Sequence, residues 1–347
     1  MPSYDYSQGM HVGIVGATGQ VGSVMRGILI EREFPIDSIR FFASERSAGK
    51  KIGFQGHDIV VENATTANWD GLDIVLFSAG GGLSKELAPT VASAGAIVID
   101  NSSAWRMDDD VPLVVPEVNS HALEEIPKGI VANPNCTTMV AMPVFKPLHT
   151  EAGLEKLIIS TYQATSGAGL SGVEELTNQI NEAGSSAIDL THNGSAVAFS
   201  NGESFIEPIA FNVVPFCGSL IDDELEETNE ERKLRDESRK ILEIPDLAVS
   251  ATCVRVPVYT GHSLAVSASF SSPLSASKVR TILKEIPSVI LDDVPTPLKS
   301  AGADSTYVGR VRPDTVLANG ISLFLSGDNL RKGAALNAVQ IAESLNL

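Results

Sequence analysis

The chain has 347 residues, of which 43% are hydrophobic and 20% charged, and its formal net charge is −18. This length is sufficient for two domains with separate cores. The acidic balance disfavours nucleic acids and anionic membranes as partners, because both bind basic surfaces, and no apolar run approaches the ~20 residues of a membrane helix.

The first ten residues, MPSYDYSQGM, lack the basic and apolar regions of a signal peptide, and we expect a short, loose tail there. The three cysteines, Cys136, Cys217 and Cys253, are scattered along the chain and do not form the pattern of a disulfide framework. We therefore expect reduced thiols and a cytoplasmic protein.

The first predicted elements are a strand, a glycine-rich turn and a helix. Residues 12–15 form a short apolar run, glycines follow at 16, 19 and 22, and apolar residues then recur at helical spacing. Further strands are predicted at 38–44, 73–80, 96–103 and 129–135, with a helix at about 84–94. Alternating strands and helices predict a doubly wound, mostly parallel sheet, with its ligand at the carboxyl ends of the strands.

The pattern changes after residue 135. The sequence predicts strands at 157–165, 248–258, 263–271 and 321–327, and helices at 229–242, 276–285 and 333–346. Ser171 and Glu174 have the spacing of a capping box at the start of one more helix. These elements predict an α+β domain with a largely antiparallel sheet over residues 136–328, after a first domain of residues 1–135.

The glycine-rich turn has the spacing Gly16-x-x-Gly19-x-x-Gly22. Glycine lets backbone N–H groups approach a pyrophosphate closely, and the positive end of the helix dipole favours the same anion. A glycine pattern alone is weak, but this one follows a strand and opens an amphipathic helix, which is the context of a dinucleotide site. The alternative is a tight turn that binds no ligand.

The end of the second predicted strand indicates which nicotinamide cofactor binds. Enzymes that use NAD usually place an acidic residue there for the ribose 2′-hydroxyl. Here the segment offers the donors Ser44, Arg46 and Ser47, and an arginine suits a 2′-phosphate. Glu45 conflicts with this interpretation unless its side chain points away. We predict NADP, with a solvated loop as the alternative.

Cys136 follows Asn-Pro-Asn at a strand end, where a helix is expected to begin. A helix N-terminus stabilises a thiolate, and Pro143 should limit how far the helix continues. A cysteine taken at random is more often an inert buried thiol, but this one lies at a carboxyl strand end beside a predicted nicotinamide site. Cys253 lies within an apolar strand and is expected in the core.

A nucleophilic thiol needs a partner, and His262 is the histidine with an informative context. It follows Gly261 in RVPVYTGHS, a stretch that begins with Arg255. A regular strand would place residues seven apart on opposite faces, but Pro257 and Gly261 make a bend between them. His57, His149 and His192 are interpreted by default as surface or structural residues.

Much of the acidic charge is concentrated in 222-DDELEETNEE-231, which holds seven carboxylates in ten positions. We interpret most of this run as a solvated loop that leads into a helix. The net charge also means that an anionic substrate requires a few local Arg or Lys residues acting against an unfavourable overall field.

With these motifs in place, the chain resembles the bacterial aspartate-semialdehyde dehydrogenases over nearly its whole length. The matching segments are GATGQVG, ASERSAG, DNSSAWRM, ANPNCTT, YQATSGAG, EERK, RVPVYTGHS and DNLRKGAALNA. The resemblance implies a Rossmann domain and a dimerising domain like that of glyceraldehyde-3-phosphate dehydrogenase. It also implies that a C-terminal helix, at about 329–347, returns to the first domain.

The reaction implied by the resemblance is the reversible reductive dephosphorylation of 4-phospho-L-aspartate to L-aspartate 4-semialdehyde with NADPH. It belongs to the biosynthesis of lysine and diaminopimelate, threonine, methionine and isoleucine. Partners would be the small-molecule substrates, inorganic phosphate and a second copy of the chain in a homodimer, or a tetramer. No metal, nucleic acid or membrane is implied.

The resemblance also assigns roles to residues. Cys136 resembles the nucleophile that forms a thioacyl-enzyme, His262 the acid/base, and Gln163 the residue that positions the substrate. Arg255 would bind the α-carboxylate in a bidentate manner, and Glu230 would face the substrate ammonium.

Arg106, Asn135 and Lys233 resemble the phosphate site, and Lys233 lies one helical turn after the ammonium-binding glutamate. Without the resemblance, the charged members of this set would be interpreted as surface residues. The predicted cofactor-binding residues are Gly16, Thr18, Gly19, Gln20, Val21, Gly22, Ser44, Arg46, Ser47, Ser78, Ser166, Gly167, Gly169 and Asn329.

Three alternatives remain at this point. The nearest is another phosphate-dependent aldehyde dehydrogenase, such as N-acetyl-γ-glutamyl-phosphate reductase or glyceraldehyde-3-phosphate dehydrogenase, although Glu230 favours a substrate with a free amino group. The second is a cysteine hydrolase that uses Cys136 and His262, which would leave the glycine-rich turn without a role. The third is a non-catalytic dinucleotide-binding regulator.

Overall fold

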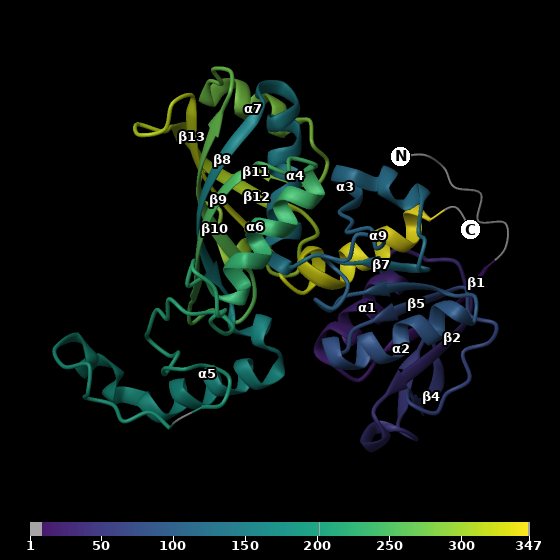
Figure 1. The fold of residues 1–347 in the computed structure, drawn as a ribbon. Helices are drawn as coiled ribbons and strands as arrows, with labels where there is room; N and C mark the ends of the chain where they lie inside the picture. Colours follow the sequence, from purple (N-terminus) through teal and green to yellow (C-terminus); the bar gives the residue numbers. More distant parts are fainter. Residues whose placement is uncertain (1–8, 201, 346–347) are drawn as a thin grey trace. The chain divides into compact units, whose positions relative to one another are not determined.

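The structure is a computed structural model that describes residues 9–200 and 202–345. The predicted loose tail lies outside the described residues up to residue 8, and Met10 already belongs to the first strand. The chain forms two compact units, each with its own sheet (Figure 1). Unit 1 contains the described residues of Met1–Asn135, Lys240–Leu242 and Gly333–Leu347, and unit 2 contains those of Cys136–Arg239 and Glu243–Lys332.

Unit 1 is built on a seven-stranded sheet with the order β3-β4-β2-β1-β5-β6-β7. All neighbouring strands are parallel except β3 and β4. The predicted doubly wound, Rossmann-type sheet is therefore confirmed. Its strands are β1 (Met10–Val15), β2 (Ile36–Ala43), β3 (Lys51–Phe54), β4 (His57–Asn63), β5 (Ile74–Phe77), β6 (Ile97–Asp100) and β7 (Ile130–Ala132).

The helices of unit 1 cover an apolar sheet. Ile74–Phe77 is buried along its whole length, as expected for a central parallel strand. The last helix packs against the first, and Arg32 and Glu343 join them through two hydrogen bonds of 2.6 Å. The helices are α1 (Gln20–Glu31), α2 (Gly81–Ser93), α3 (Pro116–Asn119) and α9 (Leu336–Ser344), the last preceded by a π-helical turn at Arg331–Ala335.

The β3–β4 hairpin was missed by the sequence analysis. Its strands lie at the sheet edge and carry several polar residues, so they lack an apolar run. The turn between them is Gln55-Gly56, with φ of 46° and 83°. Positive φ at both central residues is the conformation of a type I′ hairpin turn, for which Asn-Gly is the stronger sequence signal.

Unit 2 is built on a six-stranded sheet with the order β11-β12-β13-β10-β8-β9. Three neighbouring pairs are antiparallel, and the pairs β8–β9 and β11–β12 are parallel. The predicted α+β unit with a mostly antiparallel sheet is confirmed. Its strands are β8 (Leu154–Gln163), β9 (Ala248–Arg255), β10 (His262–Phe270), β11 (Val289–Leu291), β12 (Thr306–Pro313) and β13 (Gly320–Gly327).

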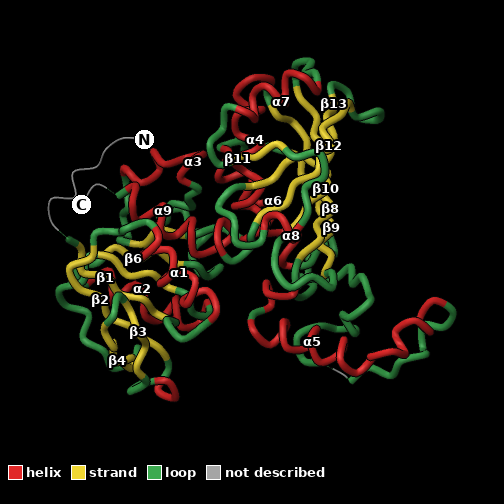
Figure 2. The backbone as a smooth tube through the Cα atoms, turned by 180° about the vertical axis from the view of Figure 1, so that it is seen from behind, coloured by secondary structure: helices red, strands yellow, loops and turns green. Residues whose placement is uncertain are grey.

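Helices cover one face of this sheet. Figures 1 and 2 show α4 and α7 on the same face, and α4 contacts β8, β10 and β13. Ile158 and Tyr162 are exposed on β8, which has an alternating burial pattern along most of its length. The helices of unit 2 are α4 (Cys136–Ala152), α5 (Leu170–Ala183), α6 (Asn229–Leu242), α7 (Ala276–Lys284) and α8 (Pro297–Ser300). The last three residues of α6, Lys240–Leu242, belong to unit 1.

Two local predictions in unit 2 were wrong. Helix α4 does not stop near Pro143 but continues through Pro143 and Pro147 to Ala152. Residues 137–145 form an unbroken buried run. Burial of several apolar side chains, at roughly 1.5–3 kcal/mol each, outweighs the ~3 kcal/mol that a proline costs inside a helix.

The predicted capping box at Ser171 is the second error. Ser171 lies inside α5, whose N-cap is Gly169, with φ of 86° and no side-chain cap. A capping box forms instead at α6, where the Glu231 N–H donates to Thr228 Oγ1 at 3.3 Å and the Thr228 N–H donates to Glu231 Oε2 at 2.8 Å. The Ser-x-x-Glu pattern at Ser171 therefore does not form a capping box, because Gly169, which accepts a positive φ, occupies the N-cap of this helix.

Candidate active site

The glycine-rich turn of unit 1 is a backbone cradle at the carboxyl end of β1. Gly16 has φ of 80°, and a Cβ there would lie 2.1 Å from the Ser78 carbonyl oxygen. A Cβ on Gly22 would lie 2.3 Å from the Gly16 carbonyl oxygen. Gly19 caps α1 without a side-chain hydrogen bond, and Gln20 Oε1 is buried without a partner among the described residues. These features fit a bound pyrophosphate.

The predicted 2′-phosphate segment follows β2. Ser44 and Arg46 are exposed, whereas Ser47 is buried and its N–H donates to the Ser44 carbonyl at 2.8 Å. Glu45 is exposed as well. The other predicted cofactor residues of this unit lie on the cradle, in the first turn of α1 and after β5: Thr18, Gln20, Val21 and Ser78.

Arg106 and Asn135, the predicted phosphate residues of unit 1, are both largely buried, with 7% and 6% of their surface exposed. Arg106 Nε donates to the Asn133 carbonyl at 2.9 Å, and its Nη2 donates to the Asn101 carbonyl at 3.0 Å. These carbonyls follow β7 and β6, so the guanidinium is oriented by the ends of two parallel strands. A charge held in this way has little freedom to swing toward solvent.

Lys240 supports the same loop and was not identified from the sequence. Its Nζ donates to the carbonyls of Arg106, Asp108 and Val111 at 3.0, 2.8 and 3.0 Å. Burial lowers the pKa of this ammonium, partly offset by Asp109 and Asp108. In the sequence it is one more charge on a polar helix, so no local signal distinguishes it.

Cys136 is the first residue of α4 and is half-buried. The other two cysteines differ from it in exposure. Both are buried, and burial raises the pKa of Cys217 to about 11 and that of Cys253 higher still. Among the three thiols, only Cys136 combines a helix N-terminus with partial exposure.

The strand register in unit 2 gathers the remaining polar residues. Gln163 ends β8 and pairs with Arg255, which ends β9. His262 begins β10, on the other side of β8, where Ser263 pairs with Tyr162. Three strand ends therefore lie side by side although their residues are far apart in the chain.

Glu230 is the centre of one part of this cluster. Its Oε1 accepts from Gln163 Nε2 at 3.1 Å, and its Oε2 accepts from Lys233 Nζ at 3.2 Å. Thr161 Oγ1 donates to Gln163 Oε1 at 3.0 Å, which fixes the orientation of the amide. Glu230 and Gln163 are both largely buried.

Arg255 and His262 are brought together despite their separation of seven residues. A Cβ on Gly167 would lie 2.8 Å from Arg255 Nη1 and 3.0 Å from His262 Nε2. The chain bends between the two residues, and Gly261 has φ of 101°. His262 is fully buried, and desolvation together with the Arg255 cation lowers its pKa to about 3, against the opposing effect of Glu230.

The predicted nicotinamide-side residues of unit 2 also form a connected group. Asn329 Nδ2 donates to Ser166 Oγ at 2.8 Å, and its Oδ1 accepts from the Gly261 N–H at 2.8 Å. Asn329 thereby connects the turn after β8 to the turn before His262. Gly169 completes the segment in a left-handed conformation.

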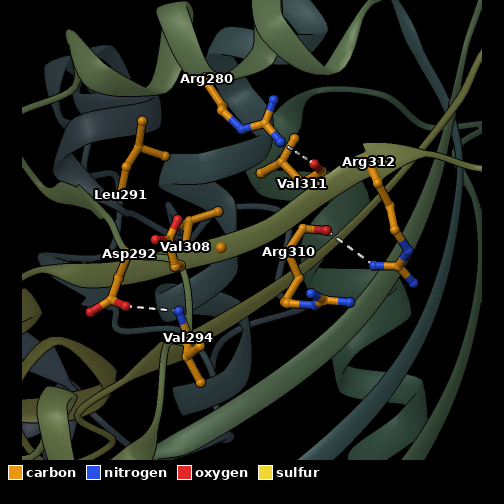
Figure 3. A pocket seen from close by; sticks show the side chains of 10 residues that line it. Arg280, Leu291, Asp292, Val294, Val308, Arg310, Val311 and Arg312 are labelled. Carbon is orange, nitrogen blue, oxygen red and sulfur yellow. Dashed lines mark hydrogen bonds between the residues drawn. The ribbon is translucent and has the colours of Figure 1, made fainter.

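A separate cavity of about 410 Å³ lies elsewhere in unit 2 (Figure 3). Arg280, Arg310 and Arg312 contribute to its lining, and two of them donate to backbone carbonyls, Arg280 to Val311 and Arg312 to Arg310. None of the predicted site residues lines this cavity. It is therefore distinct from the candidate active site.

Two further findings concern the described residues only. They contain no group of three or more His, Cys, Asp or Glu side chains arranged to hold a metal ion. None of their helices combines the length and apolar character that crossing a bilayer requires.

Comparison with known proteins agrees with this architecture. Residues 11–126 match the family model of the semialdehyde dehydrogenase NAD binding domain, and residues 145–332 match that of the semialdehyde dehydrogenase dimerisation domain. An aspartate-semialdehyde dehydrogenase of Streptomyces akiyoshiensis is 62% identical over 334 residues, which cover 96% of this chain and 98% of that protein. The chain belongs to the aspartate-semialdehyde dehydrogenase family.

Solved structures of the family are similar throughout. Aspartate-semialdehyde dehydrogenase II of Vibrio cholerae, complexed with ASA, has a TM-score of 0.90 and 42% identity over 97% of this chain and 98% of its own. The enzyme of Candida albicans, with NADP, has a TM-score of 0.76 and 25% identity over 97% and 98%. The chain is thus an oxidoreductase with an NAD(P)-binding domain and a dimerisation domain.

Proposed function

We propose that this enzyme catalyses the reversible reduction of 4-phospho-L-aspartate to L-aspartate 4-semialdehyde with NADPH. The product feeds the synthesis of lysine and diaminopimelate, threonine, methionine and isoleucine. The observation that carries the proposal is the buried cluster of Gln163, Glu230, Arg255 and His262 in the same unit as a half-buried Cys136 at a helix N-terminus. Membership of the family supports the same substrate.

The substrate is held by complementary charges. Arg255 binds the α-carboxylate as a bidentate partner, since a guanidinium matches the two oxygens of a carboxylate. Glu230 binds the ammonium group, and Gln163, which donates to Glu230 at 3.1 Å, positions the substrate. A requirement for a free amino group distinguishes this substrate from an N-acetylated one.

The phosphate group is bound by Arg106, Asn135 and Lys233. Arg106 is already oriented by the carbonyls of Asn101 and Asn133, and Lys233 is held by Glu230 at 3.2 Å. Local cations of this kind are what a chain with a net charge of −18 needs to accept a doubly anionic ligand.

The cofactor is NADP(H). The glycine cradle would hold its pyrophosphate, Ser44, Arg46 and Ser47 its 2′-phosphate, and Ser166, Gly167, Gly169 and Asn329 its nicotinamide side. When bound, the nicotinamide supplies a hydride to the acyl carbon of the substrate. The NADP named in the Candida albicans structure supports this choice.

Cys136 is the nucleophile and His262 the acid/base. The thiolate attacks the acyl carbon, phosphate leaves, and a thioester is formed on Cys136. A thioester accepts hydride more readily than a carboxylate does, so the covalent step divides one difficult reduction into two easier ones. The helix N-terminus at Cys136 favours the thiolate form.

We propose an NADP-binding domain over residues 1–135 and a catalytic and dimerisation domain over residues 136–328. The C-terminal helix that joins the first domain is α9, which spans Leu336–Ser344 and is shorter than the expected range of about 329–347. A homodimer is proposed because the dimerisation-domain model matches residues 145–332. Three scattered cysteines, which lack the pattern of a disulfide framework, and a biosynthetic role favour the cytoplasm.

The test is oxidation of aspartate semialdehyde by the purified protein. We expect reduction of NADP+ only when inorganic phosphate is present. Cys136→Ala should lower the rate by more than about a thousandfold, because it removes the group that forms the covalent intermediate. Cys253→Ala, which changes a buried thiol in β9, is the matched control and should retain most of the rate.

Three outcomes would contradict the proposal. A Cys136→Ala enzyme with more than a trace of activity would exclude the covalent mechanism. Phosphate-independent substrate turnover without nucleotide would favour a hydrolase. Faster turnover of an N-acetylated semialdehyde than of aspartate semialdehyde would favour the reductase of the acetylated substrate.

A further inference from the structure

A segment after β8 forms an arm beyond one end of the sheet of unit 2 (Figures 1 and 2). We call the described residues of 170–216 the α5 arm. The arm has a small apolar core of its own, in which three phenylalanine rings pack against four buried residues: Leu176, Ile209, Ala210 and Val214. None of the residues that the sequence analysis assigned to the site lies in this arm.

The α5 arm contacts the substrate cluster at Arg255. Val214 and Arg255 exchange two backbone hydrogen bonds, of 3.0 Å to the Arg255 carbonyl and 2.8 Å to the Val214 carbonyl. The guanidinium of Arg255 lies over the ring of Phe205, with its carbon Cζ 5.7 Å from the ring centroid. The same arm therefore holds both the backbone and the side chain of Arg255.

Contacts with α5 fix the position of Phe205. The N–H of the preceding residue, Ser204, donates to Glu175 Oε2 at 2.9 Å. The buried Gln179 accepts two more N–H groups from the chain after Phe205, at 2.8 and 3.0 Å. A Cβ on Gly172 would lie 3.1 Å from the ring of Phe205, so glycine leaves the space that the ring needs beside the helix.

The guanidinium of Arg255 has one edge that can receive a carboxylate. Its Nη1 donates to the Ala164 carbonyl at 2.8 Å, whereas its Nε is buried and has no hydrogen-bond partner among the described residues. Nε and Nη2 form the edge on the other side of the group from Nη1. Arg32 binds Glu343 through this same edge, with both donors at 2.6 Å from the carboxylate oxygens.

Unit 1 contains the complete arrangement of ring, guanidinium and carboxylate. Arg40 donates from Nε and Nη2 to the two oxygens of Glu62 at 2.8 and 2.7 Å, and its Cζ lies 5.0 Å from the centroid of the Phe42 ring. A ring that faces the guanidinium leaves the in-plane donors available for a carboxylate. Phe205 and Arg255 supply the first two parts of this arrangement, and a ligand carboxylate would be the third.

We propose that Phe205 is a positioning residue for the substrate, because its ring fixes the plane in which Nε and Nη2 of Arg255 meet the α-carboxylate. The attraction between a cation and a ring face is strongest where water is excluded, and only 8% of the surface of Arg255 is exposed. The assignment rests on the proposed function, which supplies the carboxylate. It makes the α5 arm a part of the substrate site.

The ring should act on substrate binding and not on the chemical step. A guanidinium that can tilt loses one of its two parallel hydrogen bonds to the carboxylate. The carboxylate is remote from the reacting carbon, so the loss is the same before and during the reaction, and it raises KM without lowering kcat. Phosphate and NADP+ are bound by other residues in the proposed function, so their Michaelis constants should be unchanged.

Replacement of the ring tests this division. We expect Phe205→Leu to raise KM for aspartate semialdehyde by about tenfold or more, with kcat and KM for NADP+ within about threefold of the wild-type values. The matched control is Phe199→Leu. Phe199 packs against the same small core, and its ring stacks on that of Phe211 with centroids 6.5 Å apart. The control should keep the wild-type KM, and an unchanged KM in Phe205→Leu would overturn the proposal.

Fluorinated phenylalanines at position 205 distinguish the cation–ring attraction from packing. Fluorine withdraws electron density from the ring face and changes the shape of the ring little. We expect KM for aspartate semialdehyde to rise by about twofold with each added fluorine, from 4-fluoro- through 3,5-difluoro- to 3,4,5-trifluorophenylalanine. The unfolding midpoint should stay constant across the series. A constant KM across the series would assign Phe205 a packing role only.

NMR of the full-length enzyme labelled with ¹⁵N-arginine reports the contact without turnover. The Arg255 Nε–H signal is identified by its loss in Arg255→Lys. A proton over a ring face is shielded by the ring current, so we expect this signal to move downfield in Phe205→Leu and to stay in place in Phe199→Leu. An unchanged signal in Phe205→Leu would show that the ring does not hold Arg255.

These measurements separate this proposal from the proposed function. If the wild-type enzyme oxidises aspartate semialdehyde with phosphate while KM is constant across the fluorinated series, the positioning role fails and the proposed function stands. If the wild-type enzyme shows no such turnover, the proposed function fails, and the Nε–H signal still decides whether Phe205 positions Arg255.

Discussion

The two candidate binding regions of this enzyme are built in different ways. The nucleotide cradle of unit 1 is made of backbone within one short stretch, where Gly16 and Gly22 leave no room for a Cβ. The catalytic cluster of unit 2 is made of side chains from Gln163, Glu230 and Arg255, which lie on three separate elements. The nucleotide cradle depends on the absence of side-chain atoms at its glycines. The catalytic cluster depends on the positions of particular side-chain donors and acceptors.

This difference determines what each region tolerates. An added Cβ at Gly16 or Gly22 would disrupt the cradle. The chemical type of the surrounding side chains matters less, because backbone N–H groups supply the hydrogen-bond donors. In the cluster the side chains are joined by directed hydrogen bonds, such as those from Gln163 and Lys233 to Glu230, so even a substitution that keeps the charge changes the hydrogen-bond pattern. Substitutions that conserve charge or add a single methyl group therefore discriminate between the two regions.

Among the substitutions that compare the two regions, the largest effect is expected from Arg255→Lys. Lysine keeps the charge but cannot both donate to the Ala164 carbonyl, as Arg255 does at 2.8 Å, and grip a carboxylate with two parallel bonds. The specificity constant for aspartate semialdehyde should fall by about a hundredfold or more. Steady-state kinetics measure this, with Arg40→Lys, at a partly exposed ion pair with Glu62, as the control. A loss below fivefold would mean that charge alone suffices.

Gly16→Ala should have the next largest effect, in unit 1. The added Cβ would meet the Ser78 carbonyl oxygen at 2.1 Å, and φ of 80° is strained for alanine. We expect a loss of about 1–3 kcal/mol in unfolding free energy and a raised Michaelis constant for NADP+. Chemical denaturation and kinetics report the two effects. The control is Gly53→Ala, where an added Cβ would have no neighbour within 4 Å. Equal effects of the two variants would show that the cradle does not require glycine at position 16.

A pH effect is expected from His262. Its pKa is lowered to about 3 by burial and Arg255, so between this value and about 6.5 the unfolded chain binds a proton that the folded protein does not. Stability therefore rises with pH through this window and is lost as the pH falls. From pH 7 to pH 5 the loss from this group should be about 2 kcal/mol.

The measurement is the unfolding free energy at the two pH values, compared with His262→Gln. The variant should lose less than the wild-type protein over the same interval, since it lacks the titrating ring. Identical losses would show that His262 does not stay neutral in the folded protein.

The smallest effect is expected from Arg46→Ala. Arg46 is exposed, so its attraction for a 2′-phosphate is weakened by solvent. The Michaelis constant for NADP+ should rise by about tenfold and that for NAD+ should change little. An equal rise in the Michaelis constants for both cofactors would refute the assignment of Arg46 to the 2′-phosphate. It would mean that this side chain does not select between NADP+ and NAD+.

The comparison also explains which features were predictable. The glycine cradle, the parallel sheet and the main strands of unit 2 have short-range signals, namely glycine spacing and hydrophobic periodicity. The β3–β4 hairpin had only a Gln-Gly turn as its signal, and α4 continued through Pro143 because its surroundings are buried. In α4, the free energy of packing outweighed the helix-breaking propensity of proline.

The residues of the candidate site also differ in whether a local sequence signal identified them. The residue types at Cys136 and His262 attracted attention from their own contexts, and the resemblance to a family supplied the roles of Arg106, Glu230 and Lys233. Lys240 had no signal, because its three carbonyl partners lie more than a hundred residues earlier in the chain.

The sequence by itself determined the two kinds of fold, the position of the nucleotide turn and the candidate nucleophile, because these depend on local spacing and composition. Only the tertiary structure decided that Gln163, Arg255 and His262 lie at adjacent strand ends, since register is a long-range property of the sheet. It also decided that the Ala164 amide faces Nδ1 of His262. A backbone N–H is present at nearly every residue, so its direction and its partner are set by the fold and not by the residue type.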